Sequence, residues 1–515
     1  MKLYKSKKKV AVEGAVGETT TISLYAASFL CGMCVMVLEM AGSRVVAPYM
    51  GTSLVVWTSL IGVIMLSLTV GYWMGGVVSD RYPRAALLAW IVGAAALVTA
   101  FVALVANPLL NALSRGASNI YLGSVIAAIC LFSVPSALLG MVSPFVVRLA
   151  INNLGKAGAT VGRFSALSSA GSILGTFLGG FVLISLFSSR TILFIVAAVL
   201  AAVAFVLNYG GKASKTIPPL MLAILSISLG ILNEAGVLPM TPVGLNIDTQ
   251  YNAVRIMDMN AFGSGRKIRI LQTDPMGAQS LMYIDSPSEL YSDYTKFYDL
   301  AFHYKPDARR ALMLGGGGYC VPKHITATRP EVSVDVVEMD PGITAIAREY
   351  FHLADRPGQT IYHEDARSFL NREAVSGKGK YDAIFEDVFG SSYNIPFHLT
   401  TAECMSKVRD LLAPDGVFIV NIISSIDHNL FSGIYSSIAA SFPYVMIFPA
   451  TYPNDESRRQ NIMVVALASE PSHEPEPESA YMEKLLAHRW TRPFSAKIAA
   501  FTDAFAPVEK YTVGL

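Results

Sequence analysis

Long runs of apolar residues occupy the first half of the chain, and positions 21–238 carry very few charges. A helix needs roughly 20 consecutive apolar residues to cross the hydrocarbon core of a bilayer. Stretches of that length recur at 22–42, 54–78, 85–107, 119–147, 164–187, 190–209 and 216–237. The pattern therefore predicts a transmembrane helical domain over 21–238, with about seven spans and a preceding basic tail at 1–20.

Basic residues between these stretches predict the orientation of the helices. They lie before the first stretch, between the second and third, after the fourth and after the sixth: Lys5, Lys7, Lys8, Lys9, Arg81, Arg84, Arg148, Lys156, Arg163, Lys212 and Lys215. Such residues favour the cytoplasmic side of a membrane. We therefore expect a multi-pass protein of the cell (inner) membrane, surrounded by the lipid bilayer, with its N-terminus and basic tail in the cytoplasm.

Small residues recur at four-residue spacing in two of the apolar stretches. Gly171, Gly175 and Gly179 do so in the fifth stretch, and Gly71 and Gly75 in the second. This spacing lets helices approach closely. Tight packing within the bundle is the favoured interpretation, and a substrate path is the alternative.

Glu39 and Arg44 are ionisable residues near the end of the first apolar stretch. A charge at membrane depth is costly, which makes Glu39 a functional candidate, and a Glu39–Arg44 ion pair at the interface is the competing interpretation. The loop GGVVSDRYPR at 75–84 resembles the loop after the second helix of major-facilitator transporters. Transport is therefore an alternative function for the first half.

The second half has the composition of a soluble domain and alternates strand-like with helix-like runs. Strands are predicted at 311–314, 332–340, 381–389 and 416–423, and an amphipathic helix at 341–351. This alternation is typical of a parallel sheet with right-handed crossovers, in which ligands bind at the carboxyl ends of the strands. The predicted fold class is a membrane α-helical bundle fused to an α/β, Rossmann-like domain.

A glycine run follows the first of these strands. Gly315, Gly316 and Gly317 would let the backbone approach a ligand closely. Glu338 lies about 20 residues beyond the loop, near the end of the next strand, where a carboxylate can accept both ribose hydroxyls of a nucleoside.

Two further acids follow later strand-like runs. Asp365, preceded by Glu364, could accept a hydrogen bond from an adenine amino group, and Asp387 ends the run YDAIFED. One edge of the sheet would thus carry a glycine loop and three carboxylates. The alternative is a Rossmann-like domain that binds no nucleotide and has these acids on its surface.

The sequence blocks around these residues are similar, in order and spacing, to the signature blocks of spermidine synthases. They read LGGGGYCVPKHI, VDVVEMDPGI, HEDARSFL and YDAIFEDVF, and 399–422 resembles the segment that follows in that family. The resemblance covers roughly 249–425, and the fused membrane half resembles membrane-bound spermidine-synthase-like proteins of bacteria. It implies a small β-domain at 245–300 before a Rossmann domain at 301–515. The strands of the small domain would lie at 249–259, 266–274 and 278–285.

The resemblance also implies residue roles. Glu338 would hold the ribose, Met339 would pack on the adenine, and Asp365 would read its amino group. Gln279 and Tyr294 would flank the sulfonium arm. These residues, with the glycine loop and Glu364, form the predicted substrate-binding site.

Asp387 would be the catalytic acid at the reacting centre. In aminopropyl transfer a primary amine attacks a sulfonium, which leaves as a neutral thioether and needs no general acid. A carboxylate such as Asp387 can bind the amine as ammonium, take its proton and stabilise the sulfonium. The expected partners are an adenosyl sulfonium and a polyamine acceptor. We expect no metal, no cofactor beyond S-adenosylmethionine or its decarboxylated form as co-substrate, and a homo-oligomer by analogy with soluble relatives.

Two positions depart from the family pattern. Gly318 stands where the family has an Asp that grips the amino group of the donor's arm, and Gly390 stands where a second acid helps to bind the diamine. Loss of the first acid would relieve repulsion against the carboxylate of S-adenosylmethionine. An acceptor-independent lyase that forms methylthioadenosine and homoserine lactone is therefore an alternative.

Other functions were weighed against these. A transporter with a nucleoside- or polyamine-binding regulatory domain, an inactive pseudoenzyme and methyl transfer are further alternatives. The net charge of +2 and the lack of a dense basic stripe argue against a nucleic-acid partner. The five cysteines show neither metal-ligand nor disulfide spacing.

The number of crossings determines where the second half lies. Seven crossings would place it outside the cell, whereas its predicted substrate favours the cytoplasm. An eighth crossing would resolve this conflict. So would a stretch that does not cross, either 119–147, where Pro135 and Pro144 could produce a re-entrant segment, or 216–237 lying at the interface. A soluble half in the cytoplasm is the favoured prediction, and an external one is the alternative.

Overall fold

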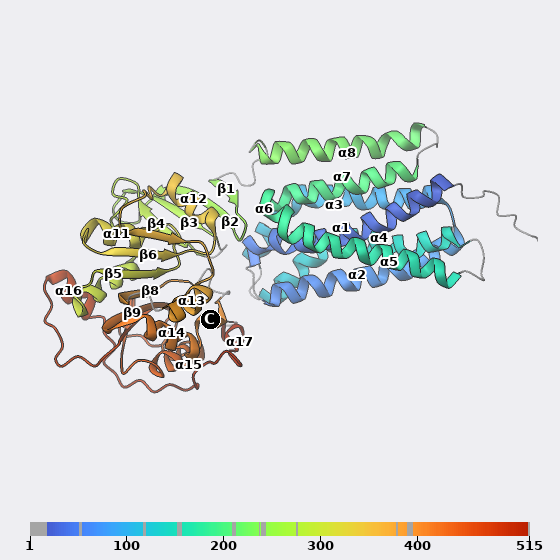
Figure 1. Ribbon diagram of the computed structural model, residues 1–515. Coiled ribbons are helices and arrows are strands. Elements are labelled where there is room, and N and C mark those ends of the chain that lie inside the picture. Colours follow the sequence, from blue (N-terminus) through green and yellow to red (C-terminus); the bar gives the residue numbers. More distant parts are fainter. Residues whose placement is uncertain are drawn as a thin grey trace, which may run out of the picture. The chain divides into compact units, whose positions relative to one another are not determined.

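The computed structural model describes residues 18–50, 54–116, 120–151, 157–208, 213–235, 237, 244–273, 277–376, 380–388 and 395–512. The chain divides into two compact units. The first comprises Met1–Val45 and Trp57–Pro239, and the second comprises Met240–Leu515 with the short piece Val46–Val56. Figure 1 shows helices alone in the first unit and two sheets with helices in the second.

The described part of the first unit is helical throughout. Its helices are α1 (Glu18–Met50), α2 (Leu54–Arg81), α3 (Ala85–Gly116), α4 (Ile120–Ala150), α5 (Ala157–Phe177), the π-helical turn η2 (Leu178–Leu183), α6 (Ile184–Leu186), α7 (Ser189–Leu207) and α8 (Ala213–Glu234). With α5, η2 and α6 counted as one, seven helices in the described residues are long and apolar enough to cross a membrane. Large apolar side chains such as Trp73, Trp90 and Phe181 are exposed on them, as expected of a surface that lipid covers. These helices indicate a multi-pass membrane protein.

Helix α4 continues without interruption past Pro135 and Pro144. The structure thus shows no break that would divide the stretch 119–147 into a re-entrant segment. The stretch 216–237 forms most of α8, which also has the length of a span. The basic residues at positions 1–17, Lys156 and Lys212 lie outside the described residues.

Glycines lie where two pairs of helices touch. A Cβ atom at Gly171 or Gly175 of α5 would overlap backbone carbonyl oxygens of α1. One at Gly71 or Gly75 of α2 would likewise overlap the backbone of α4, whereas one at Gly179 would make only ordinary contacts. The first four glycines are therefore positions of close helix packing, which agrees with the packing interpretation of their spacing.

Glu39 lies on α1 and is half-buried. No hydrogen bond or ion pair joins it to Arg44 in the part of the chain that is described, so the geometry does not support the ion-pair interpretation. An ion pair of 3.0 Å instead links Arg148, near the end of α4, to Asp80, near the end of α2.

The second unit begins with a four-stranded antiparallel sheet in the order β1-β2-β3-β4. Its strands are β1 (Leu245–Asp248), β2 (Ala253–Asn260), β3 (Lys267–Gln272) and β4 (Ser280–Tyr283). The short helices α9 (Asp293–Lys296), η3 (Phe297–Asp299) and α10 (Leu300–Tyr304) follow. Strands β3 and β4 lie within the predicted ranges, β2 extends one residue beyond the range 249–259, and β1 had not been predicted.

The larger sheet has seven strands in the order β10-β11-β9-β8-β5-β6-β7. They are β5 (Arg310–Leu314), β6 (Ser333–Val337), β7 (Gln359–Tyr362), β8 (Tyr381–Glu386), β9 (Leu412–Ser424), β10 (Tyr444–Pro449) and β11 (Gln460–Leu467). The five strands from β9 to β7 are parallel, β11 pairs antiparallel with β9, and β10 pairs antiparallel with β11. The predicted fold class, a membrane helical bundle fused to a Rossmann-like α/β domain, is confirmed.

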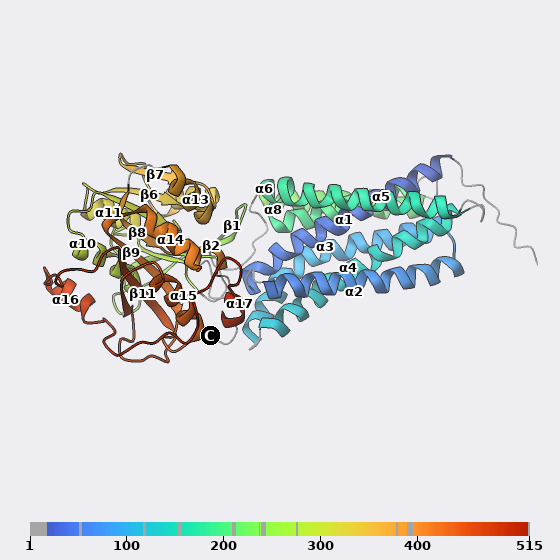
Figure 2. The same ribbon diagram turned by 60° about the horizontal axis from the view of Figure 1, so that its bottom comes forward.

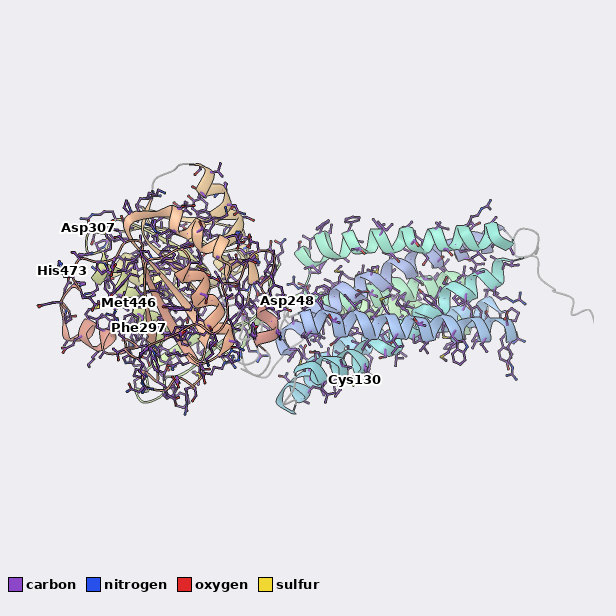
Figure 3. The ribbon with its side chains drawn as sticks, turned by 90° about the horizontal axis from the view of Figure 1, so that it is seen from below. Cys130, Asp248, Phe297, Asp307, Met446 and His473 are labelled. Atoms are coloured by element: carbon purple, nitrogen blue, oxygen red, sulfur yellow. The ribbon has the colours of Figure 1, made fainter. Side chains whose placement is uncertain are left out.

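Helices pack on both faces of the larger sheet (Figures 1 and 2). One hydrophobic core contains residues of α11 (Cys320–Thr328) and α12 (Pro341–Tyr350). The other contains residues of α13 (Ala366–Ser376), α14 (Ala402–Leu411) and α15 (Asn429–Ala439). The remaining short elements are η4 (Phe397–Leu399), α16 (Ala480–Leu486) and α17 (Val508–Thr512). Phe297 and Met446 are buried in the first core, while Asp307 and His473 lie at the margin of the unit (Figure 3).

A buried aspartate joins the small sheet to the larger one. Asp340 caps the start of α12 by accepting a hydrogen bond from the Gly342 backbone N–H (2.9 Å). It also accepts from Asn252 Nδ2 (2.9 Å) and from the Thr249 hydroxyl, both in the turn between β1 and β2. Fully buried carboxylates require such partners. This contact holds the small sheet against the carboxyl edge of the larger sheet.

Candidate active site

A cavity of about 430 Å³ lies at the carboxyl edge of the larger sheet and is closed on one side by the small sheet and α9. All ten residues predicted for the catalytic and substrate-binding site line it: Gln279, Tyr294, Gly315, Gly316, Gly317, Glu338, Met339, Glu364, Asp365 and Asp387. They come from six separate segments, four of which follow the parallel strands β5, β6, β7 and β8. Gln279 directly precedes β4, and Tyr294 lies on α9. Glu39 and Arg44 belong to the other unit, and Gly390 lies outside the described residues.

The glycine loop after β5 is held close to the end of β8. Gly315 has a φ of +92°, and a Cβ atom there would overlap the Asp387 carbonyl oxygen. Only glycine combines this backbone conformation with this approach at low cost. The conformation directs the next N–H groups of the loop toward the end of β6.

Glu338 receives those N–H groups. Its Oε2 accepts from Gly316 N (2.9 Å) and Gly317 N (3.1 Å), and its Oε1 accepts from Asp340 N (2.9 Å). Loss of solvent raises the pKa of the Glu338 carboxyl, and the three backbone hydrogen bonds oppose that rise. The loop therefore supplies donors to a carboxylate that has lost part of its hydration.

Asp387 lies one residue beyond the end of β8, with both oxygens hydrogen-bonded to neutral groups. Tyr294 Oη donates to Oδ2 (3.0 Å), and Asn421 Nδ2 donates to Oδ1 (3.0 Å). Asn461 Nδ2 donates in turn to Asn421 Oδ1 (3.0 Å). Burial raises the pKa of Asp387, and the bonds from Asn421 and Tyr294 partly offset that rise. Among the described residues no cation pairs with this carboxylate, which leaves its charge for a ligand.

Tyr294 is suited to remain a donor to Asp387. Desolvation and the nearby Asp387 charge raise the pKa of its phenol well above the usual value. The phenol therefore keeps its proton across the physiological pH range.

The other predicted residues make more local contacts. Asp365 Oδ1 accepts from Ser368 N (2.9 Å) at the start of α13, and its Oδ2 lies 3.3 Å from His398 Nε2. Glu364 pairs with Arg372 (2.8 Å). Gln279 Oε1 accepts from the Thr273 hydroxyl (3.0 Å).

Met339 projects into solvent at the rim of the cavity, with 45% of its surface exposed. It is an apolar side chain that directly follows Glu338 in a lining with four carboxylates.

The space beside Gly318 is filled by a residue of the small sheet. The Gly318 N–H donates to Ser280 Oγ (2.9 Å), and a Cβ atom at this position would lie 2.8 Å from Ser280 Cβ. The space in which the family pattern places an acid is thus filled by a serine.

Sequence reasoning missed three side chains of this region. Asn421 and Asn461 line the cavity. Asn421 interrupts the apolar run 417–423 of β9, which could have served as a signal, whereas Asn461 follows Gln460 at the start of β11. Glu386 is 1% exposed, and its Oε2 has no hydrogen-bond partner among the described residues. Burial raises the pKa of Glu386 to about 8, and the charge of Asp387 adds to the rise.

All charged side chains among the described lining residues of the cavity are acidic. Four carboxylates line the cavity, from Glu338, Glu364, Asp365 and Asp387, and none of its described lining residues is Lys, Arg or His. A cavity of this kind favours a cationic ligand.

No family model matches the chain. A polyamine aminopropyltransferase of Vibrio vulnificus is 29% identical over 196 residues, which make up 35% of this chain and 64% of that protein. A probable polyamine aminopropyl transferase of Bifidobacterium longum is 32% identical over 155 residues, 30% of this chain and 33% of that protein. The crystal structure of a probable spermidine synthase from Corynebacterium glutamicum has a TM-score of 0.40 and 19% identity, and the match covers 53% of this chain and 95% of that one.

The chain spans less than two thirds of the length of either of these two sequence relatives. The acid after β8, the glycine loop after β5 and the acids after β6 and β7 follow one another along one sheet edge. Together with these relatives, that arrangement makes the chain a spermidine-synthase-like protein.

Proposed function

We propose that the chain is a membrane-integral enzyme that transfers an aminopropyl group from decarboxylated S-adenosylmethionine to an amine and releases 5'-methylthioadenosine. The single observation that carries this proposal is the cavity lining, with four carboxylates and no basic side chain among its described residues. The decarboxylated donor is a cation at both its sulfonium and its amino group. A ligand with two positive charges fits a cavity whose charged described lining residues are all acidic.

In this proposal the acids after β6 and β7 bind the adenosyl group. The three backbone N–H groups use three of the about four lone-pair sites of the Glu338 carboxylate, and the remaining site on Oε1 can accept a ribose hydroxyl. Met339 covers the adenine ring, and Asp365 faces its amino group. Gln279 and Tyr294 lie beside the arm that carries the sulfonium.

Asp387 carries out the proton transfer. The acceptor nitrogen attacks the methylene carbon bound to sulfur, so that a C–N bond forms and the C–S bond breaks. The electron pair of that bond stays on sulfur, which leaves as the neutral thioether of methylthioadenosine. The proton of the acceptor ammonium passes to Asp387 and from there to water. The raised pKa of Asp387 makes it a stronger base than an exposed aspartate.

The same lining argues for the decarboxylated donor over S-adenosylmethionine itself. The carboxylate of S-adenosylmethionine would enter a cavity whose described lining offers it no cation, and a buried charge without a partner is costly. Ser280, which contacts Gly318, is neutral and therefore supplies no cation for that carboxylate either.

Product analysis tests the proposal. The purified full-length chain is incubated with S-adenosylmethionine or its decarboxylated form, each with and without a primary amine, and products are identified by mass spectrometry. We expect methylthioadenosine only from the decarboxylated donor with an amine, and almost none from the Asp387→Asn variant. Methylthioadenosine from S-adenosylmethionine alone would instead establish a lyase. Donor binding without any product would establish a regulatory or inactive domain.

We further propose that the membrane domain spans 21–238, that 245–300 forms the small β-domain, and that 301–515 forms the catalytic domain in the cytoplasm. Phe262 is 91% exposed at the β2–β3 turn and offers a reporter position. A Phe262→Cys variant should react with a membrane-impermeant maleimide in inside-out vesicles and not in intact cells, with the wild type as the control for native cysteines. Labelling in intact cells would place the domain outside.

A further inference from the structure

The cavity follows the order of strands along the sheet edge. Asp365 comes after β7, Glu338 after β6, and the glycine loop after β5. Asp387 comes after β8, near the middle of the sheet. Neighbouring strands are about 4.8 Å apart, so the lining changes step by step from the β7 side to the β11 side.

Beyond Asp387 the wall comes from β9 and β11. Asn421 and Ile423 lie on β9, and Asn461 lies on β11 directly opposite Ile423 in the antiparallel register. All three are uncharged. The segment 389–394 follows Asp387, lies outside the described residues and contains no acidic residue in its sequence. Among the described lining residues, this end of the cavity therefore has no carboxylate except Asp387.

The two amides are ordered by the hydrogen bonds that lead to Asp387. Asn421 donates to Asp387, and Asn461 donates to Asn421, so one N–H of each Nδ2 group is used. No described residue donates to Asn461 Oδ1. This end of the cavity thus presents a neutral carboxamide oxygen next to the aliphatic side chain of Ile423.

The number of positively charged nitrogens limits which acceptor can bind at the β9–β11 end of the cavity. The donor's amino group and the attacking nitrogen both lie near Asp387 in the proposed reaction. A diamine would add a third nitrogen, as an ammonium, against Asn461 and Ile423. An ammonium removed from water without a carboxylate partner is strongly disfavoured, whereas a hydroxyl is satisfied by one amide oxygen.

We infer that the acceptor is a primary amine with an uncharged, hydrogen-bonding far end, of the amino-alcohol class, and that Asn461 and Ile423 at the β9–β11 end of the cavity select it over a diamine. This inference rests on the proposed aminopropyl transfer and specifies its acceptor. The bond changes are those given for that reaction, with the nitrogen of the amino alcohol as nucleophile.

A matched set of four-carbon acceptors tests the inference. The full-length chain, with saturating decarboxylated S-adenosylmethionine, is given 4-aminobutan-1-ol, 1,4-diaminobutane or butylamine, and kcat/KM is measured from methylthioadenosine release with the adduct mass as confirmation. We expect 4-aminobutan-1-ol to exceed 1,4-diaminobutane at least tenfold and to exceed butylamine by a smaller factor. An equal or better rate with the diamine overturns the inference and leaves the transferase intact. No product with any acceptor overturns both.

A charge placed in the wall provides the second test. Ile423→Glu adds a carboxylate opposite Asn461, and Ile423→Gln adds a side chain of the same shape without the charge. We expect Ile423→Glu to shift the ratio of kcat/KM toward the diamine by at least tenfold relative to Ile423→Gln. Donor binding by both variants verifies that they fold. If the two folded variants show the same ratio, the wall does not determine the acceptor.

Discussion

Over β5, β6 and β7 the cavity wall consists of backbone N–H groups and carboxylates, whereas over β9 and β11 it consists of carboxamides and an aliphatic side chain. Glu338 exemplifies the first end, since three backbone donors hold a carboxylate there. Asn461 exemplifies the second, since its amide bonds only to another amide. One sheet edge can thus carry carboxylates at one end and neutral groups at the other, with Asp387 between them.

The largest effect should come from the residue that separates the two ends. Asp387→Asn keeps the shape but removes the charge and the base, so kcat should fall by about 10²–10⁴-fold. Tyr294→Phe removes one neutral donor and should lower kcat by about tenfold or less. Steady-state rates of methylthioadenosine release measure both. Equal losses in the two variants would show that Asp387 acts only through its hydrogen bonds.

The donor end should respond next. Glu338→Gln removes the carboxylate that we propose to bind the ribose, and KM for the donor should rise roughly 10- to 100-fold with a smaller change in kcat. Glu364→Gln is the control, because Glu364 also lines the cavity but pairs with Arg372. Its KM should change by about threefold or less. A larger increase in KM for Glu364→Gln would indicate that the donor does not bind at the end of β6.

Substitutions in the glycine loop test whether the backbone conformation of this loop affects Asp387. Gly315→Ala introduces both a strained φ and an overlap with the Asp387 carbonyl, and should cost more than the roughly 1–3 kcal/mol of strain alone and also reduce kcat. Gly263→Ala has a φ of +81° but open space around its Cβ, so it should lower stability and leave kcat unchanged. Thermal unfolding and kinetics measure the pair. An unaltered kcat in Gly315→Ala would show that the conformation of the loop does not affect Asp387.

The smallest effect should be a pH-dependent change in stability at Glu386, which precedes Asp387. Its folded pKa of about 8 exceeds that of an unfolded glutamate near 4.3. The folded state therefore keeps a proton that the unfolded state loses, and stability falls as pH rises between these values. Glu386→Gln lacks this titration, so its Tm relative to wild type should rise by about 5 °C or more between pH 5 and pH 9. A constant difference would show that Glu386 is ionised in the folded protein.

The donor end was predictable because its residues lie in short segments that each follow one strand. The glycine loop, Glu338 and Asp365 come within a few residues of the ends of β5, β6 and β7, and parallel strands bring such ends together whatever the rest of the fold does. Apolar length alone likewise predicted the membrane helices, since lipid requires about 20 apolar residues in each span.

The acceptor end was not predictable in this way. Asn461 reaches the cavity only because β11 pairs antiparallel with β9 and places Asn461 opposite Ile423. A shift of one residue in that register would turn Asn461 to the other face of the sheet.

The sequence by itself determined the helices that are long and apolar enough to cross a membrane, the glycine loop after β5 and the acids after β6, β7 and β8, because each depends on local pattern. Only the tertiary structure decided that Ser280 occupies the space beside Gly318, that Asn421 and Asn461 lead to Asp387, and that Gly171 packs on α1. These contacts join segments far apart in the chain. Their existence depends on register and packing, which no local pattern of residues encodes.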